Sequence, residues 1–160
     1  MNKLPAKHIA LMGIFVSLSF VGSLIKIPSP IGSPALDSAP GYFSSLAFGI
    51  GEGFIVAFLG HLITTITAGS PLGILHVFIG MGMGICAVIF RVCYEKWNSI
   101  AAIISCIILN GIVLPLIVIP FHGIALYWAI LPSLLIASTL NLCISAGIYM
   151  KIKDRITMIR

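Results

Sequence analysis

Long apolar stretches, separated by short polar or proline-containing breaks, make up most of the chain. They cover about residues 6–25, 42–50, 52–68, 72–93, 99–119 and 127–150. A helix needs about 20 mostly apolar residues to cross the hydrocarbon core of a bilayer, and only the second stretch is much shorter than that. The pattern predicts an all-α integral membrane protein in which six transmembrane helices form a single domain over residues 1–160.

The first break is longer than the others and differs from them in composition. Residues 26–40 contain four prolines, three serines, one glycine and the carboxylate of Asp37. Proline cannot continue a helix and restricts the residue before it, so this segment is a loop. Apolar residues such as Ile27 and Leu36 argue against disorder, and long loops in compact domains are usually functional. We therefore expect a lid that packs on the membrane domain.

Composition supports a membrane protein and excludes several functions. Hydrophobic residues make up 59% of the chain and charged residues 8%, whereas a soluble domain has about 25% charged residues. Six spans leave no room for a soluble catalytic or nucleotide-binding domain, and the chain has no phosphate-binding loop motif. If the protein moves a substrate uphill, the energy comes from a gradient or from a partner.

The basic residues predict an orientation in the membrane. With six spans and a cytoplasmic N-terminus, eight of the nine lysines and arginines fall on the cytoplasmic side, and only Lys26 falls outside. This bias follows the positive-inside rule and places both termini in the cytoplasm. The chain has no basic face with interleaved aromatic residues, so we expect contact with the lipid bilayer and no nucleic-acid partner.

A few polar side chains lie within the predicted spans, where such groups are costly and usually face an interior or a cavity. His61 and Thr65 are four residues apart and so share one helical face. In the predicted topology nearly all of these groups lie in the outer half of the bilayer or near its middle. We expect an outward-facing cavity beneath the loop that binds a neutral or weakly charged organic ligand. The candidate ligand-binding residues are Asp37, Tyr42, His61, Thr65, His76, Asn110, Tyr127, Trp128 and Asn141.

Purely structural roles could explain the same residues. The histidines and asparagines could hydrogen-bond neighbouring helices, and Tyr127 and Trp128 could anchor the protein at the membrane interface. Asp37 could cap the second span, and Glu52 is expected to cap the third on the cytoplasmic side.

Metal binding and catalysis have little support in the sequence. The histidines lack metal-ligand spacing, and the spans contain no catalytic motif and no pair of carboxylates. We expect no catalytic residues, no metal and no cofactor; an intramembrane enzyme or a metal-binding membrane protein is the more distant alternative.

Two sets of small residues predict close approach between helices. Gly80 and Gly84 are four residues apart in the fourth span, a spacing that lets another helix pack closely. Gly13 and Ser17 repeat this spacing in the first span, and Ala10 lies three residues before Gly13. That groove could receive an internal helix or a partner membrane protein.

Several short segments together resemble one family of membrane proteins. They are Lys26-Ile27-Pro28-Ser29-Pro30, the run from Ala35 to Phe43, Gly60-His61-Leu62, and the run from Thr67 to Gly73 followed by His76. Over essentially the whole chain the pattern resembles the substrate-binding S components of energy-coupling factor (ECF) vitamin transporters. Within that family it looks most like the branch assigned to alpha-ribazole, a cobalamin precursor.

The resemblance implies a prokaryotic cell-membrane protein that is not itself an enzyme. It implies capture of a vitamin or precursor from outside, followed by delivery to the cytoplasm. Delivery would need a transmembrane coupling subunit, EcfT, and two cytoplasmic ATPases, and is thought to involve toppling of the S component in the membrane. S components usually dock through an Ala-x-x-x-Ala motif on the first helix, so we expect docking at Ala10, Gly13 and Ser17.

The candidate residues would fit alpha-ribazole, in which dimethylbenzimidazole is joined to ribose. Tyr42, Tyr127 or Trp128 would contact the flat ring. The ribose hydroxyls would bind Asp37, Asn110 or Asn141. Riboflavin, pantothenate or another vitamin is the alternative substrate.

Overall fold

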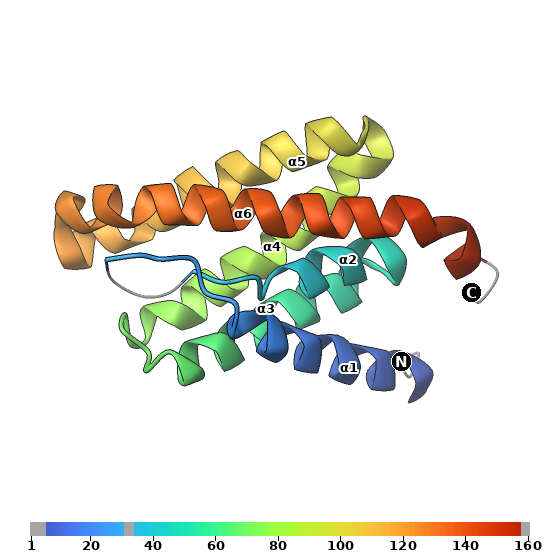
Figure 1. Ribbon diagram of the computed structural model, residues 1–160, viewed down its shortest axis with the longest axis horizontal. Helices are drawn as coiled ribbons and strands as arrows, with labels where there is room; N and C mark the ends of the chain where they lie inside the picture. The colour runs from blue at the N-terminus through green and yellow to red at the C-terminus, as the bar shows by residue number, and fades with distance from the viewer. Residues whose placement is uncertain (1–5, 31–33, 158–160) are drawn as a thin grey trace.

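The computed structural model describes residues 6–30 and 34–157, and most of them are helical (Figure 1). The helices are α1 (Ala6–Ser23), α2 (Ala39–Ala47), α3 (Ile50–Thr67), α4 (Leu75–Lys96), α5 (Ser99–Ile108), a π-helical turn η1 (Leu109–Val113), a 3-10 turn η2 (Leu114–Val118) and α6 (Ile119–Thr157). An isolated antiparallel bridge joins Lys26 to Ala35 in the α1–α2 loop, residues 24–38.

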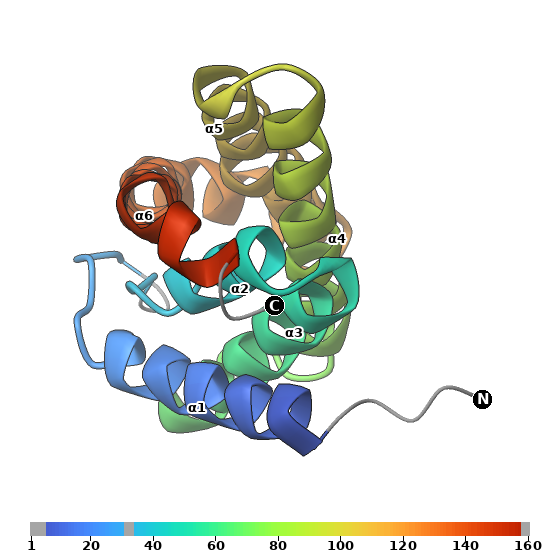
Figure 2. The same cartoon turned by 90° about the vertical axis from the view of Figure 1, so that its right-hand side faces the viewer.

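The helices run along the long axis of the molecule in alternating directions. Figure 1 shows α1 beginning and α6 ending at the right-hand end, while the α1–α2 loop lies at the left. Viewed along the helices, α1 and α5 lie on opposite sides of the bundle (Figure 2). Among the described residues α1 packs only against α2 and α3, so one side of this helix is left uncovered.

Glycines in α4 allow close packing against α3, as their spacing predicted. A Cβ atom at Gly84 would lie 2.6 Å from the Phe54 ring, and one at Gly80 would lie 3.1 Å from the Phe58 ring. Both rings therefore occupy the space that larger residues in α4 would need. The small-x-x-x-small interpretation of Gly80 and Gly84 is confirmed.

The main apolar core lies between α2, α4, α5 and α6. Tyr42 and Phe90 are both fully buried there, with ring centroids 5.4 Å apart in an edge-to-face arrangement. A second cluster of buried residues, which includes Val118 and Ile130, packs η2 against the first part of α6. Members of both clusters, such as Met83 and Val118, also line the cavity described below.

The fifth and sixth stretches differ from their predicted boundaries. The α-helix expected over residues 99–119 ends at Ile108 and continues as η1 and η2. Pro115 explains this change, because it has no N–H to bond to the preceding turn and its ring clashes there. Helical structure resumes at Ile119 instead of Tyr127, with one break at Gly123, where φ is +80°.

Length and composition identify four candidate membrane spans in the described residues. They are Ala6–Ser23, Ile50–Thr67, Leu75–Lys96 and the 58-residue stretch Ser99–Ile156. The prediction of six is not supported on this criterion. The nine residues of α2 extend only about 14 Å at 1.5 Å per residue, which is too short for a span. Ser99–Ile156 counts as one stretch because its helical segments follow one another without a gap, although the chain reverses near Gly123.

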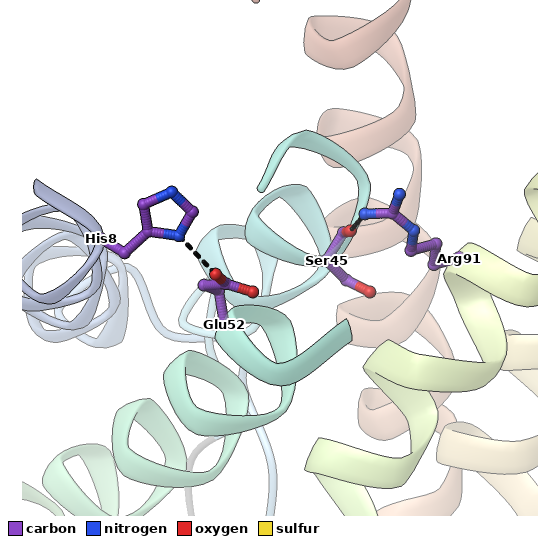
Figure 3. A network of polar contacts seen from close by, with 4 residues as sticks. All are labelled: His8, Ser45, Glu52 and Arg91. Carbon is purple, nitrogen blue, oxygen red and sulfur yellow. Dashed lines mark hydrogen bonds and ion pairs between the residues drawn. The ribbon is translucent and has the colours of Figure 1, made fainter. Parts of the chain in front are cut away.

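Polar contacts link the helices at the end of the bundle away from the α1–α2 loop (Figure 3). Glu52 lies in the first turn of α3, where Gly49 and not Glu52 occupies the N-cap position, and its carboxylate is 2.6 Å from Nδ1 of His8 in α1. Arg91 in α4 donates a hydrogen bond of 2.6 Å to the carbonyl of Ser45 and pairs with Glu95 at 2.8 Å. These contacts join α1 to α3 and α2 to α4.

Candidate ligand-binding site

A cavity of about 160 Å³ lies near the α1–α2 loop. Holding one water takes roughly 10–15 Å³ on this measure, so the cavity has room for an organic ligand. Its walls come from the loop, α3, the start of α4, η1, η2 and α6. Most of the lining is apolar, with side chains such as Met83, Leu126 and Leu134.

Asn141 of α6 fixes the loop beside the cavity. Its Oδ1 accepts hydrogen bonds from the backbone N–H groups of Ser38 (3.1 Å) and Ala39 (2.8 Å). Its Nδ2 donates to the carbonyls of Ala35 (2.9 Å) and Ala137 (2.8 Å). All the strong hydrogen-bonding directions of this amide are therefore used within the protein.

Asp37 is held on this anchored part of the loop. It is 7% exposed, lines the cavity and accepts a 3.0 Å hydrogen bond from the Ser38 hydroxyl. Burial raises the pKa of Asp37 above its ordinary value of 3.8, while the hydroxyls of Thr64 and Ser38 act in the opposite direction. Ser38 occupies the N-cap position of α2, so Asp37 is not the cap that the structural alternative proposed.

Two histidines meet at the cavity wall. His61 Nε2 lies 3.3 Å from His76 Nδ1, and the backbone N–H of Leu72 donates to His76 Nε2 at 3.3 Å. Because Nε2 of His76 accepts, the proton of a neutral His76 ring is on Nδ1 and points to His61 Nε2. The proton of His61 is then on Nδ1, which gives this pair one further donor.

Asn110 and Thr65 supply the remaining predicted polar groups. Asn110 lies in η1, where its Nδ2 donates to the Ser138 hydroxyl at 2.9 Å. Single π-turns often occur at functional sites, and this one brings Asn110 to the cavity. The hydroxyl of Thr65 has no hydrogen-bond partner among the described residues.

Six of the nine predicted ligand-binding residues line this one cavity. They come from the loop and four helical segments and are Asp37, His61, Thr65, His76, Asn110 and Asn141.

The three predicted aromatic contacts are not part of the cavity lining. Tyr42 is fully buried in the main core, and its hydroxyl has no described partner. Tyr127 is buried in the second cluster, with its hydroxyl 3.4 Å from the carbonyl of Ile112. Trp128 is 62% exposed, a position that agrees with the alternative of a membrane-interface anchor.

Some lining residues were not among the predicted set. Leu126, Ile130, Leu134 and Ser138 form one face of α6, and Ser38 and Thr64 add two hydroxyls. Their four-residue spacing in α6 is visible in the sequence. Apolar periodicity alone does not distinguish a cavity wall from a packed helix interface.

The proposed docking residues lie away from the cavity. Ala10, Gly13 and Ser17 are all exposed on α1. A Cβ atom at Gly13 would meet nothing within 4 Å, and the Ser17 hydroxyl bonds the carbonyl of Gly13 in its own helix. Within the described part of the chain, no internal helix fills this groove.

Comparison with known proteins identifies the family. The family described as "ECF transporter, substrate-specific component" matches residues 7–152. The chain belongs to the ECF transporter substrate-specific components. A solved structure described as "Structure and mechanism of the S component of a bacterial ECF transporter" has the same fold, with a TM-score of 0.73 and 18% sequence identity. The match covers 94% of this chain and 98% of that one. No curated protein matches the chain.

Family membership establishes the general role of this S component. It is a multi-pass cell-membrane protein and a vitamin-type substrate-binding subunit rather than an enzyme, with ATPase activity in partner subunits. In the described residues, no group of three or more histidine, cysteine, aspartate or glutamate side chains is arranged to hold a metal ion.

Proposed function

We propose that this S component captures a vitamin or vitamin precursor from outside the cell in the cavity beside the α1–α2 loop. The observation that carries this assignment is the convergence of polar residues from distant parts of the sequence on one mostly apolar cavity. Pockets of this kind, with few oriented polar groups, are typical of sites for organic ligands. The ligand-binding residues are then Asp37, His61, Thr65, His76 and Asn110, with Asn141 holding the loop.

Alpha-ribazole is the substrate that we favour. Its flat ring would contact the apolar wall and the histidine rings, and its ribose hydroxyls would hydrogen-bond Asp37, Thr65 or Asn110. The support is the sequence resemblance to the alpha-ribazole branch, together with the mixture of apolar and polar lining residues.

We further propose a single domain with six membrane crossings and both termini in the cytoplasm. The alternating directions of the helices support this count, with Ser99–Ile156 supplying two crossings and the short α2 crossing with the residues that flank it (Figure 1). The charges support the orientation, because Lys26 lies on the α1–α2 loop whereas Arg91, Lys96 and Lys151 lie toward the opposite end.

The energising partners are proposed to be the coupling subunit and two cytoplasmic ATPases of an ECF module. Docking of the coupling subunit on Ala10, Gly13 and Ser17 agrees with the exposure of these residues and the open space at Gly13. Small residues allow the close helix approach that membrane interfaces use.

Thermal unfolding of the purified protein against a panel of vitamins and precursors tests the function. A ligand at about 100 times its dissociation constant stabilises the folded state by about 2.7 kcal/mol, so alpha-ribazole should raise the melting temperature. Absence of any shift across the panel would contradict substrate binding as proposed.

Substitution of His76 tests the assigned site. His76→Ala removes a ring that accepts from Leu72 and donates to His61, so ligand affinity should fall by about 1–3 kcal/mol. Thr139→Ala is the control, because its hydroxyl bonds only the Leu135 carbonyl of the same helix. Unchanged affinity in His76→Ala would remove this residue from the site.

A further inference from the structure

The charges around the cavity are unequal in a way that bears on the ligand. Asp37 is a carboxylate within the lining, and no lysine or arginine of the described chain is among the lining residues. Lys26, the basic residue of the same loop, is exposed, and its backbone pairs with Ala35. A buried negative group with no positive neighbour strongly disfavours a second negative charge nearby.

Backbone N–H groups do not compensate for this lack of positive side chains. Helix N-termini are common sites for anions, and both α2 and α4 begin beside the cavity. At α2 the N–H groups of Ser38 and Ala39 already donate to Asn141, and Pro40 has none. At α4 the N–H groups of Leu75 and His76 donate to carbonyls of the preceding turn.

The histidine pair does not supply a positive charge either. In the hydrogen-bond pattern described above, both rings are neutral. Nε2 of His76 accepts from the N–H of Leu72, and Nδ1 of His76 donates to Nε2 of His61. A second proton on His76 would place an N–H on Nε2, facing the N–H of Leu72. The pair therefore offers a neutral donor to the ligand.

We propose that this cavity selects ligands that carry no negative charge, with the ionised form of Asp37 as the specificity-determining group and Asn141 as the residue that positions it. This inference rests on the proposed function, since it names the charge class of the substrate that the same site takes. A hydroxyl or other donor of a neutral or cationic ligand bonds to Asp37. A carboxylate or phosphate at the same place meets only the Asp37 carboxylate and neutral donors.

Pairs of probes that differ in negative charge measure the selectivity. We would measure the dissociation constants of the full-length purified protein for alpha-ribazole and its 5′-phosphate, riboflavin and its 5′-phosphate, and panthenol and pantothenate. In every pair that binds, the neutral member should bind about 100-fold more tightly, since like charges placed together cost several kcal/mol. An anionic member that binds as tightly as its neutral partner, or more tightly, overturns the inference.

Two variants test the roles of the residues. Asp37→Asn keeps the shape and a hydrogen-bond acceptor but removes the charge, so the preference for the neutral member should shrink at least about 10-fold. Asp154→Asn makes the same chemical change on the exposed end of α6 and should leave the preference unchanged. An unchanged preference in Asp37→Asn would show that another group sets the charge selectivity.

A double-substitution cycle separates positioning from general loosening of the site. Asn141→Ala should lower the preference for the neutral member in the natural protein and have no further effect on it in the Asp37→Asn background. An equal effect of Asn141→Ala on the preference in both backgrounds would contradict the positioning role.

Melting temperature gives a readout that does not depend on any probe. In the ligand-free protein at neutral pH, Asp37→Asn should raise the melting temperature by several degrees, because a buried carboxylate without a positive partner is destabilising. If no probe binds, the substrate assignment fails, and this measurement still tests the premise of the inference, that Asp37 is a buried charge without a positive partner. A lower or unchanged melting temperature in Asp37→Asn overturns it.

Discussion

Single side chains hold the α1–α2 loop in place. Asn141 satisfies two backbone N–H groups and one carbonyl of the loop, and Ser145 one turn later donates to the carbonyl of Ala39 at 2.8 Å. A buried backbone group that loses its partner costs about 1–3 kcal/mol. The loop is therefore held by one face of α6 in addition to its own backbone hydrogen bonds, such as the one from the Ile27 N–H to the Pro34 carbonyl at 2.7 Å.

Replacing Asn141 should loosen this connection. Asn141→Ala leaves the N–H groups of Ser38 and Ala39 without their acceptor, so the free energy of unfolding should fall by about 2 kcal/mol. Hydrogen exchange of residues 35–39 should also become faster. Thr139→Ala on the same helix is the control, and a variant of Asn141 with the stability and exchange of the natural protein would refute the anchoring role.

The stability of the folded protein should depend on pH because of Asp37. Burial raises the pKa of this carboxyl above 3.8, so the folded state keeps the proton at pH values where the unfolded chain has lost it. Unfolding then releases a proton, and stability decreases as the pH rises through this window.

Melting curves from about pH 4 upward, near the ordinary pKa of a carboxyl, measure this effect. The melting temperature of Asp37→Asn should exceed that of the natural protein by an amount that grows with pH until Asp37 is fully ionised. A difference that becomes smaller with increasing pH would have the wrong sign.

Helix packing depends on positions where only a hydrogen atom fits. In α4, Gly84 faces the Phe54 ring, whereas in α1 Gly13 faces open space. The sequence shows both as members of small-residue pairs four positions apart. Their different surroundings follow from the positions of the helices, because α4 lies inside the bundle and α1 at its edge.

These two glycines therefore give a matched pair of substitutions. Gly84→Val should destabilise the protein by about 1–3 kcal/mol, because the added carbons overlap the Phe54 ring. Gly13→Val should change stability by less than about 0.5 kcal/mol, as surface substitutions usually do. Chemical unfolding in detergent measures both, and equal losses would contradict the packing described for α3 and α4.

Across the whole molecule, the cavity and the exposed groove of α1 are separate surfaces. The cavity is lined from the loop to α6, whereas Ala10, Gly13 and Ser17 contact none of it. Substitutions can therefore change the proposed ligand site and the proposed docking groove independently.

A double substitution on α1 should separate transport from binding. Gly13→Leu with Ser17→Leu fills the groove that a partner helix would occupy, so uptake into cells should be abolished while ligand affinity stays within about two-fold. Ala125→Leu with Ala129→Leu enlarges exposed small residues of α6 and is the control. Loss of ligand binding along with uptake would indicate that the groove has a packing role.

The sequence by itself determined the class of the protein and most of its elements. Apolar stretches too long for a soluble core, few charges and a proline-rich break are local properties, and they predicted a helical membrane protein with a long first loop. The family resemblance depended on contiguous segments such as Lys26 to Pro30 and was confirmed. Five of the six polar residues that line the cavity were predicted together because polar groups are costly within a membrane, and Asp37 was added because it lies on the long first loop.

Only the tertiary structure decided which of these residues share a cavity and what each one contacts. Asn141 is 106 residues from Ala35, and no sequence pattern shows that its amide is used by the loop. Tyr127 and Trp128 are neighbours in sequence, yet one is buried and the other exposed. The π-turn at Asn110 and the open groove at Gly13 likewise depend on how helices pack, because contact between distant segments is not encoded in local periodicity.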